Sequence, residues 1–234
     1  MRLLLTIAIA LMATGCAKHP VGAWQPEPPA VSSELVAPPA DAVVPHMTFP
    51  LHAVDAQGRD AEPITMLMAA TEASLVDAFD KAGWVAAEAV TPESTERMRT
   101  AQLWSDAYPN APVAPLYYWG RAQDAAWQLP GTTVASRLRV RVWRSDEQDE
   151  QGRWIWALNV AQDEGFIAAP HSGLPIHHML PNVDDANDRL LEALVTAGVA
   201  SRQYLLRGIG PNIGFRTASG DPYQTAGWVR VIEL

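Results

Sequence analysis

Eight prolines lie between residues 17 and 50 of this 234-residue chain, and they limit where its fold can begin. Proline has no backbone N–H to donate, so it interrupts helix interiors and central strands. We therefore expect residues 16–59 to form an extended or disordered tether and residues 60–234 to form one folded domain. The prolines are Pro20, Pro26, Pro28, Pro29, Pro38, Pro39, Pro45 and Pro50.

The first fifteen residues have the pattern of a secretion signal. Arg2 is followed by an apolar run over residues 3–13 and then by small residues. That run is too short to span a bilayer, which needs about 20 apolar residues. Residues 13–16 resemble a bacterial lipobox, the site where a signal peptidase cuts ahead of a cysteine that carries lipid. We predict a signal peptide at residues 1–15 and lipidation of Cys16, the single cysteine of the chain.

A lipid on Cys16 predicts a protein of the bacterial cell envelope that faces the periplasm. Ala17 follows the cysteine, whereas an Asp there would signal retention in the inner membrane of enteric bacteria. The outer membrane is therefore favoured over the inner membrane.

The composition is that of a globular domain and excludes one class of partner. The chain is 48% hydrophobic and 18% charged, and its net charge is -9. Nucleic-acid binding depends on clustered Lys and Arg that displace counterions, so we expect no nucleic-acid partner. With a single cysteine, the domain must derive its stability from an apolar core rather than a disulfide.

Capping signals and apolar periodicity predict three helices. Thr71 and Thr91 are N-cap candidates, and the helix after Thr91 should run to about residue 104. Asp184 is predicted to cap the third helix, which Gly198 ends. The apolar stripe of that third helix consists of Leu190, Leu191, Leu194 and Val195.

Strand patterns separate and follow these helices. Residues 137–143 alternate arginine with apolar side chains, and residues 154–160 are the expected hairpin partner. We predict a single α+β domain with one mainly antiparallel mixed sheet, packed by about three helices. The other strand candidates are residues 64–69, 84–90, 116–119, 202–206 and 228–232.

The arginines of residues 137–143 have two interpretations. Guanidinium groups bind carboxylate or phosphate in a two-point fork, so the row could hold an anion. The alternative is a solvated outer face whose arginines pair with the acidic turn at residues 146–150, and this alternative is favoured. The arginines are Arg137, Arg139 and Arg141.

His177 and His178 are the strongest candidates for chemistry. One of them could act as a general base or a ligand, with His171, Asp184 and Asp188 nearby in the sequence. Zinc sites need three or four ligands, and no typical zinc spacing occurs, so we predict no metal site. The favoured alternative is one histidine bonded to loop backbone and the other solvated. No cofactor can be named.

Arg121 and Asp124 lie three residues apart beside a turn. By itself this spacing indicates a local ion pair.

Four segments in order resemble the LssY C-terminal domain family, over about residues 64–206. The domain of that family has no established activity and is often joined to integral membrane proteins. The resemblance implies an integral membrane protein as a possible partner beside the membrane itself. The segments are Ala82-Gly83-Trp84, Pro112 to Tyr117 with the following Gly120-Arg121-x-Gln123-Asp124, Arg137-x-Arg139-Val140-Arg141-x-Trp143, and His177-His178 with Pro181, Asp184 and Asp188.

The chain departs from the pattern of this family at several positions. The pattern has acids where Leu180 and Asn182 stand, and a histidine where Arg139 stands. It has Glu and Arg where this chain has Ala186 and Asn187. If the family uses that acidic cluster for metal binding or acid–base work, this chain has lost part of it.

Three functional hypotheses follow, and the simplest of them is a structural lipoprotein with no ligand. The favoured one is a lipid-anchored envelope protein whose domain binds an anionic ligand or a membrane partner protein. The alternative is a hydrolase of phosphorylated lipids or envelope precursors. It needs the histidines and the arginine row to converge on one pocket. The candidate catalytic residues are His177 and His178, and the candidate ligand-binding residues are Arg121, Asp124, Arg139, Arg141, Trp143 and Asp184.

Overall fold

The computed structural model describes residue 38, residues 41–43, residue 45, and residues 49–131, 133–168, 175–207, 212–217, 220 and 222–234. The predicted signal peptide, Cys16 and most of the predicted tether lie outside the described residues. Within the described part, no helix is both long and apolar enough to cross a membrane.

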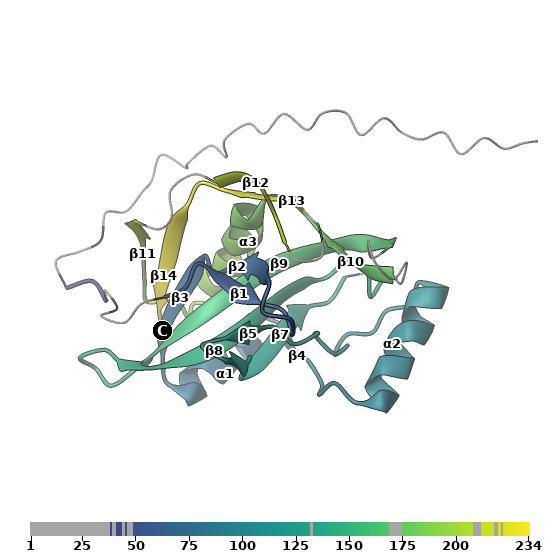
Figure 1. Cartoon of the computed structure of the whole chain (residues 1–234). Helices are drawn as coiled ribbons and strands as arrows, with labels where there is room; N and C mark the ends of the chain where they lie inside the picture. Colours follow the sequence, from purple (N-terminus) through teal and green to yellow (C-terminus); the bar gives the residue numbers. More distant parts are fainter. Residues whose placement is uncertain are drawn as a thin grey trace, which may run out of the picture.

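The fold is a single α+β domain with three helices in the described residues, as predicted (Figure 1). Thr71 caps the first helix and Thr91 the second, each in a reciprocal capping box with the serine three residues later. The helices are α1 (Glu72–Lys81), α2 (Pro92–Trp104) and α3 (Val183–Thr196).

The main sheet has eight strands and is antiparallel except where β14 pairs with β3. Its order is β11-β14-β3-β9-β8-β7-β4, and β10 pairs with β9 beside this path. The long β8–β9 hairpin is the predicted one and pairs Val140 with Val160. The strands are β3 (Met66–Ala70), β4 (Val85–Ala86), β7 (Ala125–Leu129), β8 (Leu138–Gln148), β9 (Trp154–Ala168), β10 (Pro175–Met179), β11 (Arg202–Arg207) and β14 (Trp228–Glu233).

Two smaller sheets add to the single sheet that the sequence predicted. A four-stranded sheet has the order β2-β1-β5-β6, and a two-stranded sheet joins β12 to β13. Strand β1 lies within the segment that was expected to be tether. The strands are β1 (His52–Val54), β2 (Asp60–Pro63), β5 (Tyr117–Tyr118), β6 (Arg121–Ala122), β12 (Asn212–Arg216) and β13 (Pro222–Thr225).

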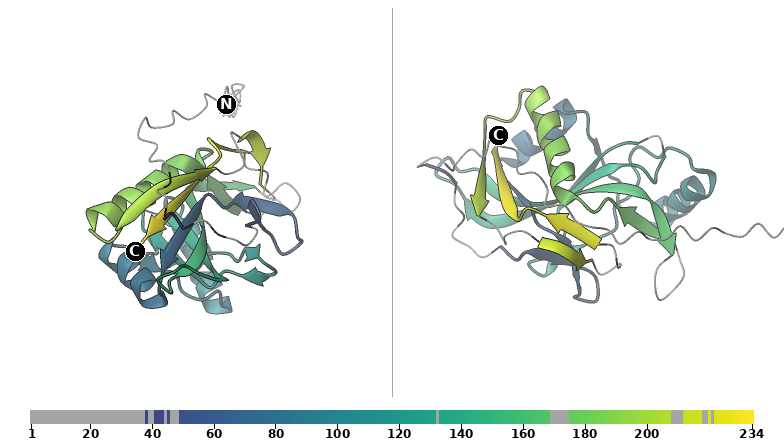
Figure 2. Two further views of the ribbon diagram at one scale, coloured as in Figure 1. Left: turned by 90° about the vertical axis from the view of Figure 1, so that its left-hand side faces the viewer. Right: turned by 90° about the horizontal axis from the view of Figure 1, so that it is seen from above.

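Both faces of the main sheet are covered. Helices α1 and α3 lie on one face, and strands β1 and β2 lie on the other (Figure 2). Because side chains alternate along a strand, Leu138, Val140 and Val142 of β8 enter the core under the helices. The arginines and Trp143 point to the opposite face. Since that face is buried by the small sheet, the expectation of a solvated arginine face is wrong.

Helix α3 ends before Gly198 as predicted, but its N-cap and one residue of its apolar stripe differ from the prediction. Asn182, not Asp184, is the N-cap, and its side chain accepts a hydrogen bond from the Asp184 backbone N–H. Leu190 and Leu194 are fully buried as expected, but Val195 is 49% exposed. Val195 follows Leu194 by one residue, which turns it about 100° away from the core.

Helix α2 stands apart from the main sheet (Figure 1). It packs through a small apolar cluster, in which Ala101 contacts Ala111 and Val134, with Met98 and Tyr108 at the edge.

Leu190→Ala should lower the free energy of unfolding by about 2–5 kcal/mol, because it leaves a cavity in a core that excludes water at this position. Chemical denaturation measures the change. The matched control is Val195→Ala on the same helix, which should have little effect because Val195 already contacts solvent. Equal losses in the two variants would contradict this core.

Candidate binding site

A buried cluster of arginines and carboxylates lies between the main sheet and the small sheet. Arg139 of β8 is at its centre and donates two parallel hydrogen bonds to Glu62 of β2, at 2.9 and 2.8 Å. Its Nε donates to Asp163 of β9 at 2.9 Å. This fork geometry is the strongest form of arginine–carboxylate pairing. Arg139 therefore joins two sheets through its side chain.

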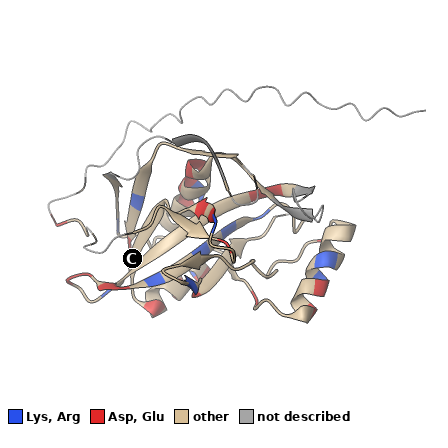
Figure 3. Cartoon of the chain, in the orientation of Figure 1, with Lys and Arg blue, Asp and Glu red and all other residues tan. Residues whose placement is uncertain are grey.

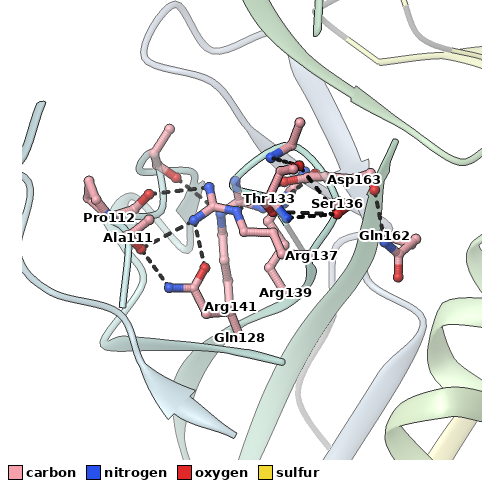
Figure 4. A network of polar contacts seen from close by, with 12 residues as sticks. Ala111, Pro112, Gln128, Thr133, Ser136, Arg137, Arg139, Arg141, Gln162 and Asp163 are labelled. Carbon is pink, nitrogen blue, oxygen red and sulfur yellow. Dashed lines mark hydrogen bonds and ion pairs between the residues drawn. The ribbon is translucent and has the colours of Figure 1, made fainter. Parts of the chain in front are cut away.

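The neighbouring arginines extend the cluster in both directions along β8 (Figure 4). Arg141 donates to Glu62 at 3.0 Å and to Asn159 at 2.9 Å. Arg137 donates to Asp163 at 3.2 Å and to Gln128 at 2.6 Å. The cluster is also bonded to the 111–114 loop, because carbonyls of that loop accept from Arg137 and Arg141.

Among the described residues, the cluster contains three guanidinium groups and two carboxylates. Arg137, Arg139 and Arg141 are 3%, 5% and 4% exposed, and Glu62 and Asp163 are their two carboxylate partners. Burial would raise the pKa of Glu62, but the charges of Arg139 and Arg141 outweigh it and lower that pKa to about 2. Both carboxylates are therefore fully paired with arginine.

The three arginines are compensated unequally. Burial lowers the pKa of Arg139, but Asp163 and Glu62 reverse this and raise it above its ordinary value. Burial and the like charge of Arg139 together lower the pKa of Arg141 to about 10. Burial also lowers the pKa of Arg137. Arg139 is therefore the best compensated of the three arginines.

An open cavity of about 520 Å³ lies beside this cluster. Its polar side chains come from the segment before β8, from β9 and from α3. Arg189 of α3 hydrogen-bonds Gln162 at one side, and Thr133 and Ser136 contact each other at another. The lining residues are Thr133, Ala135, Ser136, Gln162, Asp163, Glu164, Gly165, Leu180 and Arg189.

Asp163 connects the cavity to the cluster. It is a lining residue, its side chain is fully buried, and both oxygens accept from arginine. Its backbone N–H donates to the Arg137 carbonyl at 2.8 Å. Hydrogen bonds of both the side chain and the backbone of Asp163 thus fix this part of the cavity wall.

Three predicted ligand-binding residues are buried instead of open to a ligand. Arg139 and Arg141 are occupied by the cluster. Trp143 has no exposed surface and packs against Tyr118, with ring centroids 5.6 Å apart. The assignment of these residues to a ligand stays a prediction, and their burial argues against it.

Arg121 and Asp124 form the expected local ion pair, at the other end of β8 from the cavity. The turn between β5 and β6 uses positive φ at Trp119 and Gly120, as two-residue hairpins do. The Asp124 carboxylate also accepts from the backbone of Arg144. Ser136 and Arg144 are eight residues apart along the chain, which is roughly 25 Å at the rise of a strand. This ion pair therefore lies away from the cavity and is not part of its lining.

Asp184 lies in the first turn of α3 and fixes that helix to the C-terminal end of β13. Its carboxylate accepts from the Thr225 hydroxyl at 2.8 Å and from the Ala226 backbone N–H at 2.6 Å. Burial raises its pKa, and these hydrogen bonds act in the opposite direction. Asp184 therefore positions the helix and is not part of the cavity lining.

The two histidines belong to β10, which is paired with β9 next to the cavity. His177 pairs with Phe166, but its side chain lies outside the described residues, as does His171. His178 is half-buried. Two residues later, Leu180 lines the cavity. Among the described residues, no three His, Cys, Asp or Glu side chains are grouped to hold a metal.

Sequence reasoning missed most of the cavity lining and, among the charged residues of this site, Glu62, Arg189 and Asp163. Glu62 stands in a short strand with no periodic signal. Arg189 is a polar residue on the solvent-exposed face of helix α3. Asp163 had a usable signal, because the run 162–164 is polar within a strand that is otherwise apolar.

The family model described as LssY C-terminus matches residues 43–229. The chain belongs to this family. No curated protein and no solved structure gives a significant match.

Glu62→Gln should lower the free energy of unfolding at neutral pH by about 3–5 kcal/mol, because it leaves Arg139 and Arg141 buried without their carboxylate. The pKa of Glu62 is lowered in the folded state, so its contribution is full above its unfolded pKa of about 4.3 and is lost as pH falls toward 2. The difference in the free energy of unfolding between variant and parent should therefore become smaller as pH falls through this range.

Chemical denaturation between pH 7 and pH 2.5 tests this expectation. Glu96→Gln is the control, because Glu96 forms an exposed pair with Arg99, and such pairs contribute little. A constant difference at every pH would show that Glu62 is not the carboxylate that compensates the arginines.

Proposed function

We propose that this protein is a lipid-anchored protein of the bacterial cell envelope whose domain binds a small anionic ligand in the open cavity. The observation that carries the proposal is the guanidinium of Arg189 in the cavity lining, beside the hydroxyls of Thr133 and Ser136 and with three buried arginines directly behind the wall, in a chain of net charge -9. The cluster and the cavity lining together bring four guanidinium groups to three carboxylates. A low-dielectric wall strengthens the field of such charges in a cleft.

The groups at the cavity fit an anion that also carries hydroxyl or amino groups. Arg189 offers a guanidinium to phosphate or carboxylate. The hydroxyls of Thr133 and Ser136 can donate to the same ligand. Glu164 is exposed and can accept from a hydroxyl or ammonium group beside the anion. A phosphorylated polyol or a headgroup of similar chemistry meets these requirements.

The hydrolase alternative receives less support. It requires Arg139 and Arg141 to hold phosphate beside His177 or His178. The described residues put both arginines in the buried cluster, where Glu62 and Asp163 already occupy their donors. The cavity itself is next to β10, so a role for the histidines at its edge stays a prediction. A membrane protein as partner also stays a prediction.

Arg189→Ala should abolish stabilisation by an anionic ligand. The experiment follows thermal unfolding of residues 17–234 with inorganic phosphate and with glycerol phosphate. A ligand at 100 times its dissociation constant adds about 2.7 kcal/mol, which corresponds to roughly 5–10 °C for a domain of this size. We expect this shift in the parent and in Lys81→Ala, an exposed control on α1. Loss of the shift only in Arg189→Ala supports the site, and a shift retained in that variant contradicts it.

Cys16→Ser should leave an unlipidated and uncleaved precursor in the bacterial host, because the sulfur of the cysteine is the atom that receives the lipid. Membrane fractionation and the mass of the intact chain measure this. A mature chain of unchanged mass and membrane content would exclude Cys16 as the anchor.

A further inference from the structure

We propose that the C-terminal end of α2 inserts into the surface of a lipid bilayer and sets the mouth of the cavity against the membrane. The insertion concerns two side chains, Leu103 and Trp104, which we call the α2 tip. The proposal deepens the proposed function, because it says from which side the cavity ligand arrives.

The α2 tip is the most exposed large apolar surface among the described residues. Leu103 is 75% exposed and Trp104 is 69% exposed, and they are adjacent in the last turn of α2. Figures 1 and 2 both show α2 projecting at the end of the domain where β9 and β10 meet. The helix that carries the pair therefore projects from the rest of the domain.

The α2 tip is connected directly to the cavity wall. Two residues after Trp104, the carbonyl of Asp106 accepts from the backbone N–H of Val134 at 2.9 Å. Val134 also packs against Ala101 of α2. The residues on either side of Val134, Thr133 and Ala135, line the cavity. The position of the α2 tip is therefore fixed relative to the cavity.

The chemistry of the α2 tip fits a bilayer surface. Tryptophan favours the membrane interface, where its ring is buried and its N–H stays near water. Arg99 lies one turn before Leu103 and is exposed, at the level where lipid phosphates would lie. The helix as a whole carries both charge signs (Figure 3), so the contact depends on insertion more than on net charge.

The α2 tip is too small to be a protein interface on its own. A specific protein contact buries at least about 1,000 Å² in total, far more than two side chains provide. Membrane attachment differs, because stable attachment commonly combines a lipid with a second, weaker contact. Two inserted side chains are sufficient for a domain that a lipid already holds nearby.

The chain before the domain is long enough to allow this orientation. Asp41 is held by Arg202 of β11, at the end of the domain opposite α2. The roughly 25 residues from Cys16 to Asp41 can span at most about 80–90 Å. A domain of this size has a diameter of roughly 40 Å. The anchor can therefore be in the bilayer while the α2 tip touches it.

Vesicle flotation of residues 17–234, which lack the lipid but contain every described residue, tests the proposal. The vesicles contain phosphatidylethanolamine and phosphatidylglycerol. Because the tip without the lipid is a weak contact, flotation is followed over a series of lipid concentrations that extends into the millimolar range. There we expect the parent to float and the double variant Leu103→Ser/Trp104→Ser to lose about tenfold in vesicle affinity. The matched control is Val76→Ser/Val195→Ser, which removes two exposed apolar side chains from α1 and α3 and should float as the parent does.

Fluorescence gives an independent readout of insertion. Vesicles with brominated acyl chains should quench the parent more than Trp104→Phe, and the difference spectrum reports Trp104 alone. Equal flotation of the parent and the tip variant would overturn the proposal. A parent that does not float would also overturn it, and that result is expected if another protein covers the tip.

The two proposals fail separately. The tip variant should keep its thermal shift with glycerol phosphate, which also shows that it is folded. Arg189→Ala should keep its flotation on vesicles. Loss of the thermal shift in the tip variant together with a lowered melting temperature would show that the substitutions disturb the fold; the single variant Trp104→Phe with brominated vesicles then decides the matter.

Discussion

The structure depends on the compensation of a row of buried arginines. Arg137, Arg139 and Arg141 point to one face of β8, and a buried guanidinium without a partner costs several kcal/mol. No residue of β8 itself supplies the carboxylates. The two carboxylates are those of Glu62 on β2 and Asp163 on β9. The small sheet must therefore pack over the main sheet in one register for the domain to be stable. The second layer of the fold is thus selected by charge as well as by apolar packing.

The same compensation produces the site. Asp163 satisfies two arginines and at the same time forms part of the cavity wall. The groups that stabilise the packing of the two sheets therefore also lie directly behind the wall of the cavity.

Features that depend on local sequence were predictable, and features that depend on distant pairing were not. Thr71 and Thr91 cap helices within three residues of themselves, and the β8–β9 hairpin follows from alternation in neighbouring segments. The alternation of Arg139 was also visible, but its burial was not. Its partner Glu62 is 77 residues away, in a strand of four residues with no periodic pattern. The tether prediction also missed β1, because a strand of three residues is too short to show a period.

The departures from the family pattern agree with a binding site for an anion. Leu180 stands where the pattern has an acid, and Leu180 lines the cavity, so this chain has one carboxylate fewer there than the pattern implies. Ala186 and Asn187 replace Glu and Arg at positions that are buried here, where Asn187 exchanges hydrogen bonds with Thr65. The first change makes the cavity less acidic, and the other two are accommodated by packing and hydrogen bonding. For the anion-binding function proposed above, the missing carboxylate would favour a negatively charged ligand, while the arginines stay buried behind the cavity wall.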